Sequence, residues 1–129
     1  MSQIRVLLAD DHPIIRSGIR LLLEQAPDIT VVGETDRGSD VVGLVERLKP
    51  DVLLLDMEMP GKSGVAVAQE LQQSGAAVRV LVLSAYDDDE YIASLLATGA
   101  AGYLTKEEAL NTIVDAVRGV ARGEDGWFS

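Results

Sequence analysis

The sequence predicts an α/β domain of the (βα)5 type, a doubly wound fold with a parallel five-stranded sheet. Two observations indicate this fold class. Within 129 residues, apolar runs of strand length alternate five times with segments in which apolar residues recur at helical spacing. The links between these segments are short, and parallel strands need crossover connections, which are right-handed and place helices on both faces of the sheet.

The expected strands are short apolar runs. They occupy residues 4–9, 30–33, 52–55, 78–83 and 102–105. The run at 52–55 is continuously apolar, which is typical of a central strand buried on both faces of a parallel sheet.

The expected helices follow the strands one by one. Their apolar positions are Ile15, Ile19, Leu22 and Leu23; Val41, Leu44, Val45 and Leu48; Val67, Ala68 and Leu71; Ile92, Leu95 and Leu96; and Leu110, Ile113, Val114 and Val117. Pro27 and Pro50 mark the ends of the first two helices, and Gly99 is suited to end the fourth. The acidic residues 87–90 are expected to form the first turn of that fourth helix, where the helix dipole favours negative charge.

Composition excludes several classes of function. Eleven Lys and Arg against 21 Asp and Glu give a net charge of −10, which repels nucleic-acid phosphates, so this chain alone is not expected to bind DNA. There is no cysteine, and the N-terminus does not resemble an export signal. No apolar run approaches the ~20 residues that a membrane-spanning helix needs, and we expect a cytoplasmic protein without membrane contact.

Polar residues gather where the expected strands end. Asp10 and Asp11 follow the first strand, Asp56 the third, Ser84 the fourth and Lys106 the fifth. One strand-ending Asp usually caps a turn or a helix, but caps do not explain this combination. In doubly wound folds the carboxyl ends of the strands form the ligand-binding edge, so the five side chains are expected to converge there.

These residue types fit phosphoryl chemistry. Clustered carboxylates stay ionised at neutral pH when a cation lies among them, and oxygen ligands favour Mg²⁺. Asp10 and Asp11 are expected to hold the ion and Asp56 to share it, while Asp56 attacks a phosphoryl group to form an aspartyl-phosphate. Lys106 would neutralise phosphoryl charge, and Ser84 would donate a hydrogen bond to a phosphoryl oxygen.

Four segments, LLADDHP, LLLDMEMPGKSG, VLVLSAYDD and GAAGYLTKEEA, resemble those of response-regulator receiver domains over nearly the whole chain. The resemblance implies a flavodoxin-like fold. It also implies the site roles: Asp10 and Asp11 as the metal pair, Asp56 as phosphoacceptor, the backbone carbonyl of Glu58 as a further metal ligand, Ser84 and Tyr103 as switch residues and Lys106 as phosphate-binding lysine. Receiver domains are signalling switches that catalyse only their own phosphorylation and dephosphorylation.

The resemblance further implies partners and domain organisation. A sensor histidine kinase would supply the phosphoryl group, and phosphorylation would favour a homodimer. The segments DDHPIIRSGIRLLLE and VVGE are similar to the NarL/FixJ subfamily, in which a receiver precedes a helix-turn-helix DNA-binding domain. Residues 1–121 are therefore expected to form the receiver, and residues 122–129 the start of a linker to an output domain that this chain lacks; a natural single-domain regulator is the alternative.

The expected switch links Asp56 to the fourth helix. A phosphoryl group on Asp56 would draw the Ser84 hydroxyl inward by hydrogen bonding. The Tyr103 ring would then move from an exposed position into the space beneath the fourth helix. The face formed by the fourth helix, the fifth strand and the fifth helix would carry the output signal.

Two other functions use related residues. A haloacid-dehalogenase-like phosphatase also forms an aspartyl-phosphate, but it carries D-x-D, whereas this strand continues as Asp56-Met57-Glu58. A flavodoxin-like cofactor carrier has a Ser/Thr-rich phosphate loop after the first strand, where this chain has DDHP.

Two further features are interpreted as not functional. Gly61-Lys62-Ser63 is similar to the end of a nucleotide-binding P-loop, but Asp56 stands where that motif needs its first glycine. His12 is the only histidine, and it is interpreted as a polar loop residue with no assigned role.

Overall fold

The computed structural model describes residues 3–84, 93–94, 97–124 and 127–128, the last pair by backbone alone. The strands are β1 (Ile4–Ala9), β2 (Ile29–Thr35), β3 (Val52–Asp56), β4 (Arg79–Ser84), β5 (Gly102–Thr105) and β6 (Trp127–Phe128). The helices are α1 (Pro13–Glu24), the short 3₁₀ helix η1 (Gly38–Asp40), α2 (Val41–Leu48), α3 (Gly64–Ser74) and α5 (Lys106–Ala121). Ile92, Leu95 and Leu96 of the fourth expected helix lie outside the described residues, as do residues 87–90.

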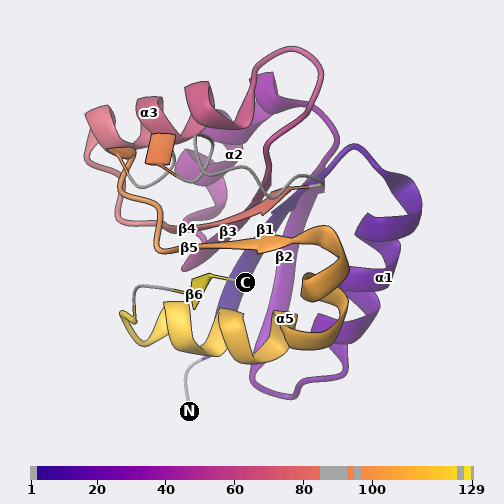
Figure 1. Cartoon of the computed structure of the whole chain (residues 1–129). Helices are drawn as coiled ribbons and strands as arrows, with labels where there is room; N and C mark the ends of the chain where they lie inside the picture. The colour runs from indigo at the N-terminus through magenta and orange to yellow at the C-terminus, as the bar shows by residue number, and fades with distance from the viewer. Residues whose placement is uncertain (1–2, 85–92, 95–96, 125–126, 129) are drawn as a thin grey trace.

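All strands belong to one parallel sheet (Figure 1). Their order is β2-β1-β3-β4-β5-β6, which confirms the predicted doubly wound fold. β2 lies on one side of β1, and the later strands lie on the other, so the strand order reverses between β1 and β3. At such a reversal the loops at the carboxyl ends turn toward opposite faces of the sheet, which opens a crevice for a ligand.

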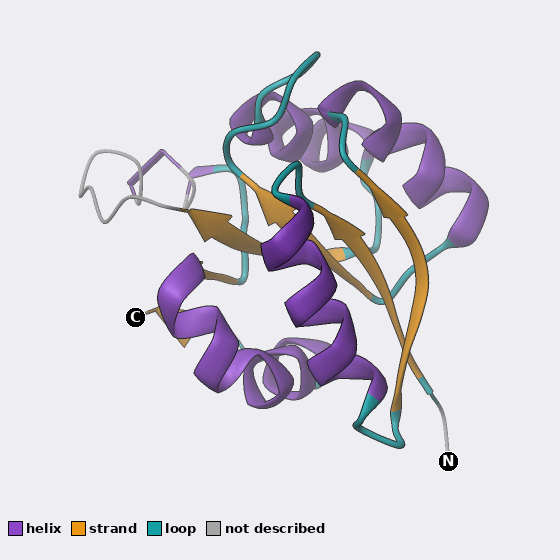
Figure 2. Cartoon of the chain, turned by 90° about the vertical axis from the view of Figure 1, so that its right-hand side faces the viewer, coloured by secondary structure: helices purple, strands orange, loops and turns teal. Residues whose placement is uncertain are grey.

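The helices cover both faces of the sheet, with α1 and α5 on one face and α2 and α3 on the other (Figures 1 and 2). The strand side chains divide between these layers. In β1, Val6 and Leu8 belong to the apolar cluster formed with α1 and α5, whereas Leu7 and Ala9 belong to the cluster formed with α2 and α3. This division follows from the period of two along a strand, which sends successive side chains to opposite faces.

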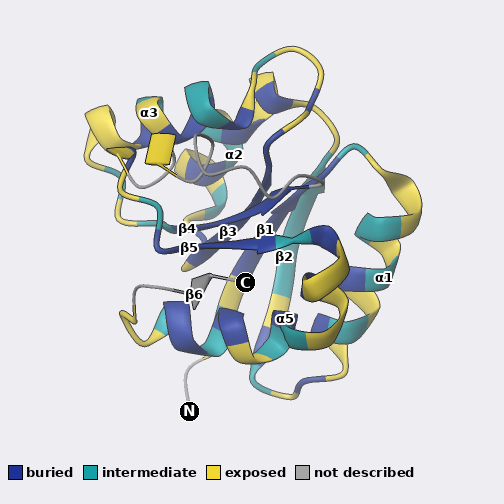
Figure 3. Ribbon diagram, in the orientation of Figure 1, coloured by how far each residue is buried: buried dark blue, intermediate teal, exposed yellow. Residues whose placement is uncertain are grey.

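The central strand carries the most deeply buried residues of the sheet (Figure 3). Every residue of β3 is buried, and its four apolar residues have no exposed surface. Each fully buried Val or Leu stabilises the fold by about 1.5–3 kcal/mol relative to an exposed one. The predicted two-sided burial of this strand is confirmed. Asp56 therefore lies at the end of a strand that is packed on both faces.

Three strands differ from the expected ranges at their ends, and one strand was not expected. β3 ends one residue later than expected, at Asp56, and β4 starts and ends one residue later, as Arg79–Ser84. β2 extends to Thr35, beyond the apolar run at 30–33, because Glu34 and Thr35 pair with the last two residues of β1. β6 lies within the residues expected to start a linker, and it pairs with β5 through Gly102 opposite Trp127 and Tyr103 opposite Phe128. A strand of two residues is too short to produce a periodic pattern in the sequence.

Among the described residues, no helix combines the length and the apolar character that crossing a bilayer requires.

The start of α3 packs directly against the backbone at the end of β3. The Gly64 amide donates to the Met57 carbonyl at 3.0 Å. A Cβ atom at position 64 would lie 2.7 Å from the Asp56 carbonyl oxygen and 2.8 Å from Met57 Cα. Only a residue without a side chain therefore allows α3 to approach the acceptor strand this closely.

We predict that Gly64→Ala destabilises the domain by about 1–3 kcal/mol, because the added methyl group forces the backbones apart. Gly43→Ala is the matched control, since a Cβ atom there meets nothing within 4 Å. That change should stabilise α2 by up to about 1 kcal/mol through helix propensity. Urea unfolding of both variants measures the difference, and equal stabilities would contradict the packing argument.

Candidate functional site

The candidate site lies at the carboxyl edge of the sheet, beside the reversal between β1 and β3. Asp10 follows β1, Asp56 ends β3, Ser84 ends β4 and Lys106 follows β5 as the first residue of α5. The start of α5 is fixed by Thr105, whose hydroxyl accepts a hydrogen bond from the Glu108 amide at 3.2 Å. The structure thus brings together side chains that are up to 96 residues apart in the sequence.

Lys106 and Asp56 form a buried ion pair at the centre of the site. The Lys106 Nζ donates to Asp56 Oδ2 at 2.9 Å and lies 3.5 Å from Asp10 Oδ1. Asp56 is 1% exposed and Lys106 is 8% exposed, so little water screens the pair. A cation is therefore already directed at the carboxylate that was predicted to accept the phosphoryl group.

Hydrogen bonds from nearby backbone amides orient the two buried carboxylates, those of Asp10 and Asp56. Asp10 Oδ1 accepts a hydrogen bond from the His12 amide at 2.7 Å, and Asp56 Oδ1 accepts one from the Glu58 amide at 3.1 Å. In each case the donor follows two residues later, as in the turns that Asp commonly forms with its own backbone. One oxygen of each carboxylate is thereby held by the loop, and the other oxygen is left for the site.

The burial and hydrogen bonding of Asp10 indicate whether these residues fit a metal ion. It is completely buried, and its Oδ2 has no hydrogen-bond partner among the described residues. A buried carboxylate oxygen without a partner is costly unless a cation compensates its charge. Asp10, Asp11, His12 and Asp56 each offer a ligand atom, and these atoms lie within 4.8 Å of one another. The residues therefore fit a divalent cation.

The pKa of Asp11 is raised by its surroundings in this cluster. Burial raises the pKa of the Asp11 carboxyl, and its hydrogen bond with Asp56 and the negative charge of Asp56 raise it further. The nearby His12 and Lys106 act in the opposite direction but do not cancel the effect. In the folded protein the Asp11 carboxylate is thus destabilised, and a bound cation would relieve this cost.

Sequence comparison identifies the family. The chain matches the response regulator receiver domain over residues 6–118. The chain belongs to the response-regulator receiver family. This receiver is 40% identical to the nitrate/nitrite response regulator protein NarL of Escherichia coli (strain K12), and the aligned part covers 92% of the chain and 55% of NarL. The receiver spans about half the length of the curated relatives it matches.

Solved structures agree with this assignment. The signal receiver domain of the putative response regulator NarL from Mycobacterium tuberculosis has a TM-score of 0.92 and 38% identity, covering 96% of this chain and 100% of that one. The isolated REC domain of RcsB from Salmonella enterica serovar Typhimurium, solved with the phosphomimetic BeF3⁻, has a TM-score of 0.90 and 25% identity, with 99% of this chain and 94% of that one covered. The chain is thus the receiver domain of a two-component response regulator of the NarL/LuxR type, as predicted from its sequence motifs.

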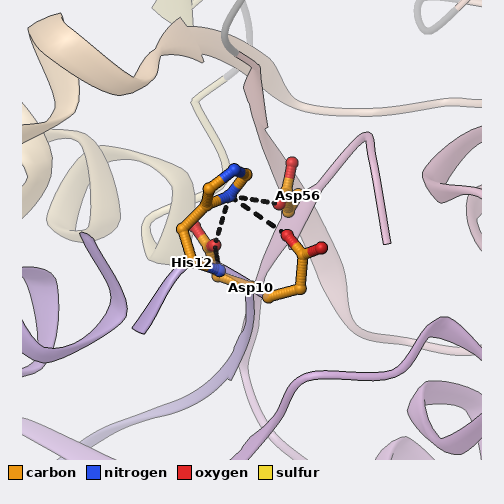
Figure 4. A group of neighbouring side chains, drawn as sticks. Asp10, His12 and Asp56 are labelled. Atoms are coloured by element: carbon orange, nitrogen blue, oxygen red, sulfur yellow. Dashed lines mark hydrogen bonds and ion pairs between the residues drawn. The ribbon is translucent and has the colours of Figure 1, made fainter. Parts of the chain in front are cut away.

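His12 belongs to the site of this receiver, although the sequence analysis gave it no role. Its Nδ1 lies 3.0 Å from Asp11 Oδ1, 3.3 Å from Asp10 Oδ1 and 3.5 Å from Asp56 Oδ2 (Figure 4). The chain has one histidine and no cysteine, so the sequence offered His12 no partners for a catalytic or zinc role. Its position directly after two aspartates was the signal that points to the site.

The predicted switch residues occupy the neighbouring strands of the receiver. Ser84 is 2% exposed and pairs in register with Thr105 of β5. Tyr103 has no exposed surface and packs in the cluster on the α2 and α3 face. The expectation that this ring starts from an exposed position is wrong for the conformation described here, because the ring already lies inside that cluster.

Glu58 and the Gly61-Lys62-Ser63 segment lie in the loop between β3 and α3. The Glu58 side chain is exposed, and its amide holds Asp56 as described above. The Lys62 ammonium pairs with Glu70, and the Ser63 hydroxyl caps α3 by accepting from the Ala66 amide at 3.2 Å. The resemblance to a P-loop therefore reflects an ion pair and a helix cap.

We predict that Asp11→Asn stabilises the receiver in EDTA and weakens Mg²⁺ binding. A raised pKa means that folding favours the protonated carboxyl, so wild type loses stability as the pH rises from the usual Asp pKa through the raised one. Asn mimics the neutral form, so the Tm of Asp11→Asn should exceed that of wild type by roughly 2–5 °C for a domain of this size. This difference should develop as the pH rises through that range and should be absent at lower pH.

Thermal unfolding between pH 4 and 8 measures the difference in Tm, and titration with Mg²⁺ measures the change in Mg²⁺ affinity. Binding should weaken about tenfold or more, which corresponds to about 1.4 kcal/mol or more. Unchanged Mg²⁺ affinity would count against Asp11 as a ligand.

Proposed function

We propose that this receiver accepts a phosphoryl group on Asp56 from a sensor histidine kinase in the cytoplasm and holds Mg²⁺ through Asp10, Asp11, Asp56 and the Glu58 carbonyl. The observation that carries this proposal is the geometry of Asp56. One carboxylate oxygen is anchored by the Glu58 amide, and the other lies 2.9 Å from the Lys106 ammonium in a buried site.

The chemistry follows from these contacts. A carboxylate oxygen of Asp56 attacks the phosphorus of a phosphohistidine; the new O–P bond forms as the N–P bond breaks, and the imidazole leaving group takes up a proton. Lys106 neutralises charge that develops on the phosphoryl oxygens, and the Glu58 amide limits rotation of the attacking carboxylate. Mg²⁺, when bound, supplies further positive charge at the phosphoryl group. The same site permits hydrolysis of the aspartyl-phosphate.

The domain organisation of the relatives supports an output role. NarL of Escherichia coli and two further relatives, which are named as transcriptional regulatory proteins, are matched over only 52–56% of their own length. We propose that residues 1–121 are the receiver and that residues 122–129 begin the connection to a DNA-binding output domain. Phosphorylation would then favour a homodimer and thereby change transcription.

We expect Asp56→Asn to fold but to take up no phosphoryl group from acetyl phosphate and Mg²⁺, because the amide is not a nucleophile. Intact-protein mass spectrometry measures the gain of one phosphoryl group. Asp36→Asn is the matched control, since Asp36 is exposed directly after β2 at the same sheet edge, and it should label like wild type.

Labelling of Asp56→Asn at the wild-type level would sink the assignment. Sustained release of phosphate from p-nitrophenyl phosphate would favour the phosphatase alternative instead.

We further propose that Ser84 and Tyr103 transmit phosphorylation to the face that includes β5 and α5. A phosphoryl group on Asp56 would accept a hydrogen bond from the Ser84 hydroxyl and shift the position of β4 against β5. Because the Tyr103 ring is buried in the conformation described here, we treat this as one of two ring positions whose populations phosphorylation changes. A hydrogen bond to a charged group contributes about 1.5–3 kcal/mol, which shifts such an equilibrium roughly tenfold to hundredfold.

Amide hydrogen exchange of β5 with and without acetyl phosphate and Mg²⁺ tests this transmission. Phosphorylation should change protection around Tyr103 in wild type and in Ser74→Ala, whose hydroxyl only bonds the Leu71 carbonyl at the end of α3. Ser84→Ala should remove most of that change while still being phosphorylated. An equal response in Ser84→Ala and wild type would exclude Ser84 as the transmitter.

A further inference from the structure

We propose that His12 is a metal ligand that gives this receiver a nitrogen donor and hence a preference for borderline divalent ions such as Co²⁺ and Zn²⁺ over Mg²⁺. The inference deepens the proposed function, since it concerns the same metal site and rests on Asp10, Asp11, Asp56 and the Glu58 carbonyl as its other ligands.

The backbone of His12 fixes the imidazole at the site. His12 is the N-cap of α1, and its amide donates to Asp10 Oδ1 at 2.7 Å while its carbonyl accepts from the Arg16 amide at 2.9 Å. Pro13, the first residue of the helix, restricts the backbone further. These backbone contacts place His12 beside the site, and its half-exposed ring is directed at the carboxylates of Asp10 and Asp56 (Figure 4).

The Nδ1 atom of His12 lies where the charged groups of the site converge. It is within 3.5 Å of one carboxylate oxygen each of Asp10, Asp11 and Asp56, and it also contacts the Lys106 ammonium. In a neutral ring with its proton on Nε2, the Nδ1 atom carries a lone pair at this point, where a cation bound by the carboxylates would lie.

A second observation indicates that the carboxylates of the cluster need more positive charge than Lys106 supplies. Asp10 has no exposed surface, and its Oδ2 has no hydrogen-bond partner among the described residues even though Lys106 lies close to Oδ1. Three carboxylates face one ammonium at this point. A divalent ion bound by Asp10, Asp11, Asp56 and His12 would compensate that negative charge more completely.

The donor set decides which ion is favoured. Mg²⁺ prefers oxygen ligands and gives up its water reluctantly, so an imidazole adds little to its affinity. Imidazole nitrogen suits the later divalent ions, whose affinity for mixed nitrogen and oxygen sites rises from Mn²⁺ toward Cu²⁺. His12 should therefore raise affinity for Co²⁺ or Zn²⁺ while leaving affinity for Mg²⁺ almost unchanged.

Calorimetric titration of wild type, His12→Asn and Asp11→Asn with MgCl2 and CoCl2 tests the selectivity. His12→Asn should weaken Co²⁺ binding about tenfold or more and change Mg²⁺ binding by less than about twofold, whereas Asp11→Asn should weaken both. Circular dichroism establishes that each variant is folded. Loss of both affinities in His12→Asn, or of neither, would overturn the assignment of His12 as a selective ligand.

Spectroscopy of bound Mn²⁺ provides an independent readout. The chain contains one histidine, so in protein without an affinity tag any imidazole nitrogen coupling in pulsed electron paramagnetic resonance comes from His12. We expect this coupling in wild type and its loss in His12→Asn, and its absence in wild type would refute direct ligation. Phosphoryl labelling of Asp56 is measured separately with Mg²⁺, so a failure of this inference is distinguishable from a failure of the proposed function.

Discussion

The buried ion pair between Asp56 and Lys106 is the constraint on which the rest of the structure depends. Two opposite charges at 2.9 Å inside a domain are tolerated because each compensates the other, and removing one partner from such a pair typically costs about 3–5 kcal/mol. The pair joins the end of β3 to the start of α5, and it forms only when the sheet places β4 and β5 correctly beside β3. The pair therefore forms only in the correctly folded domain.

Close backbone packing supports that pair from the other side. Gly64 brings α3 against the carbonyl of Asp56, and the Glu58 amide holds one oxygen of its carboxylate. The His12 amide does the same for Asp10. The loops after β1 and β3 thus use their own peptide groups to orient carboxylates, so the orientation depends on strand ends and not on long side chains.

Much of the fold and of the site was predictable from the sequence, because both depend on local patterns and on strand ends. Apolar periodicity located the strands through β5, and the convergence of Asp10, Asp56 and Lys106 follows from parallel topology. The contacts of His12 were not predicted because they depend on three-dimensional packing. Its Nδ1 lies 3.5 Å from Asp56 Oδ2, a residue 44 positions away in the sequence. The burial of Tyr103 depends on packing with α2 and α3, and no spacing rule encodes that contact.

The parallel pairing of β6 with β5 also bears on self-association. An open sheet ends in two strands whose outer N–H and C=O groups can recruit another chain, and proteins protect such edges. Here Trp127 and Phe128 cover the backbone of Gly102 and Tyr103 on one edge. At the opposite edge, Glu34 of β2 carries ion pairs with Arg16 and Arg20 of α1. The edge strand on one side is thus only two residues long, which leaves little backbone for another strand to pair with, and the strand at the other edge carries a charged, ion-paired side chain.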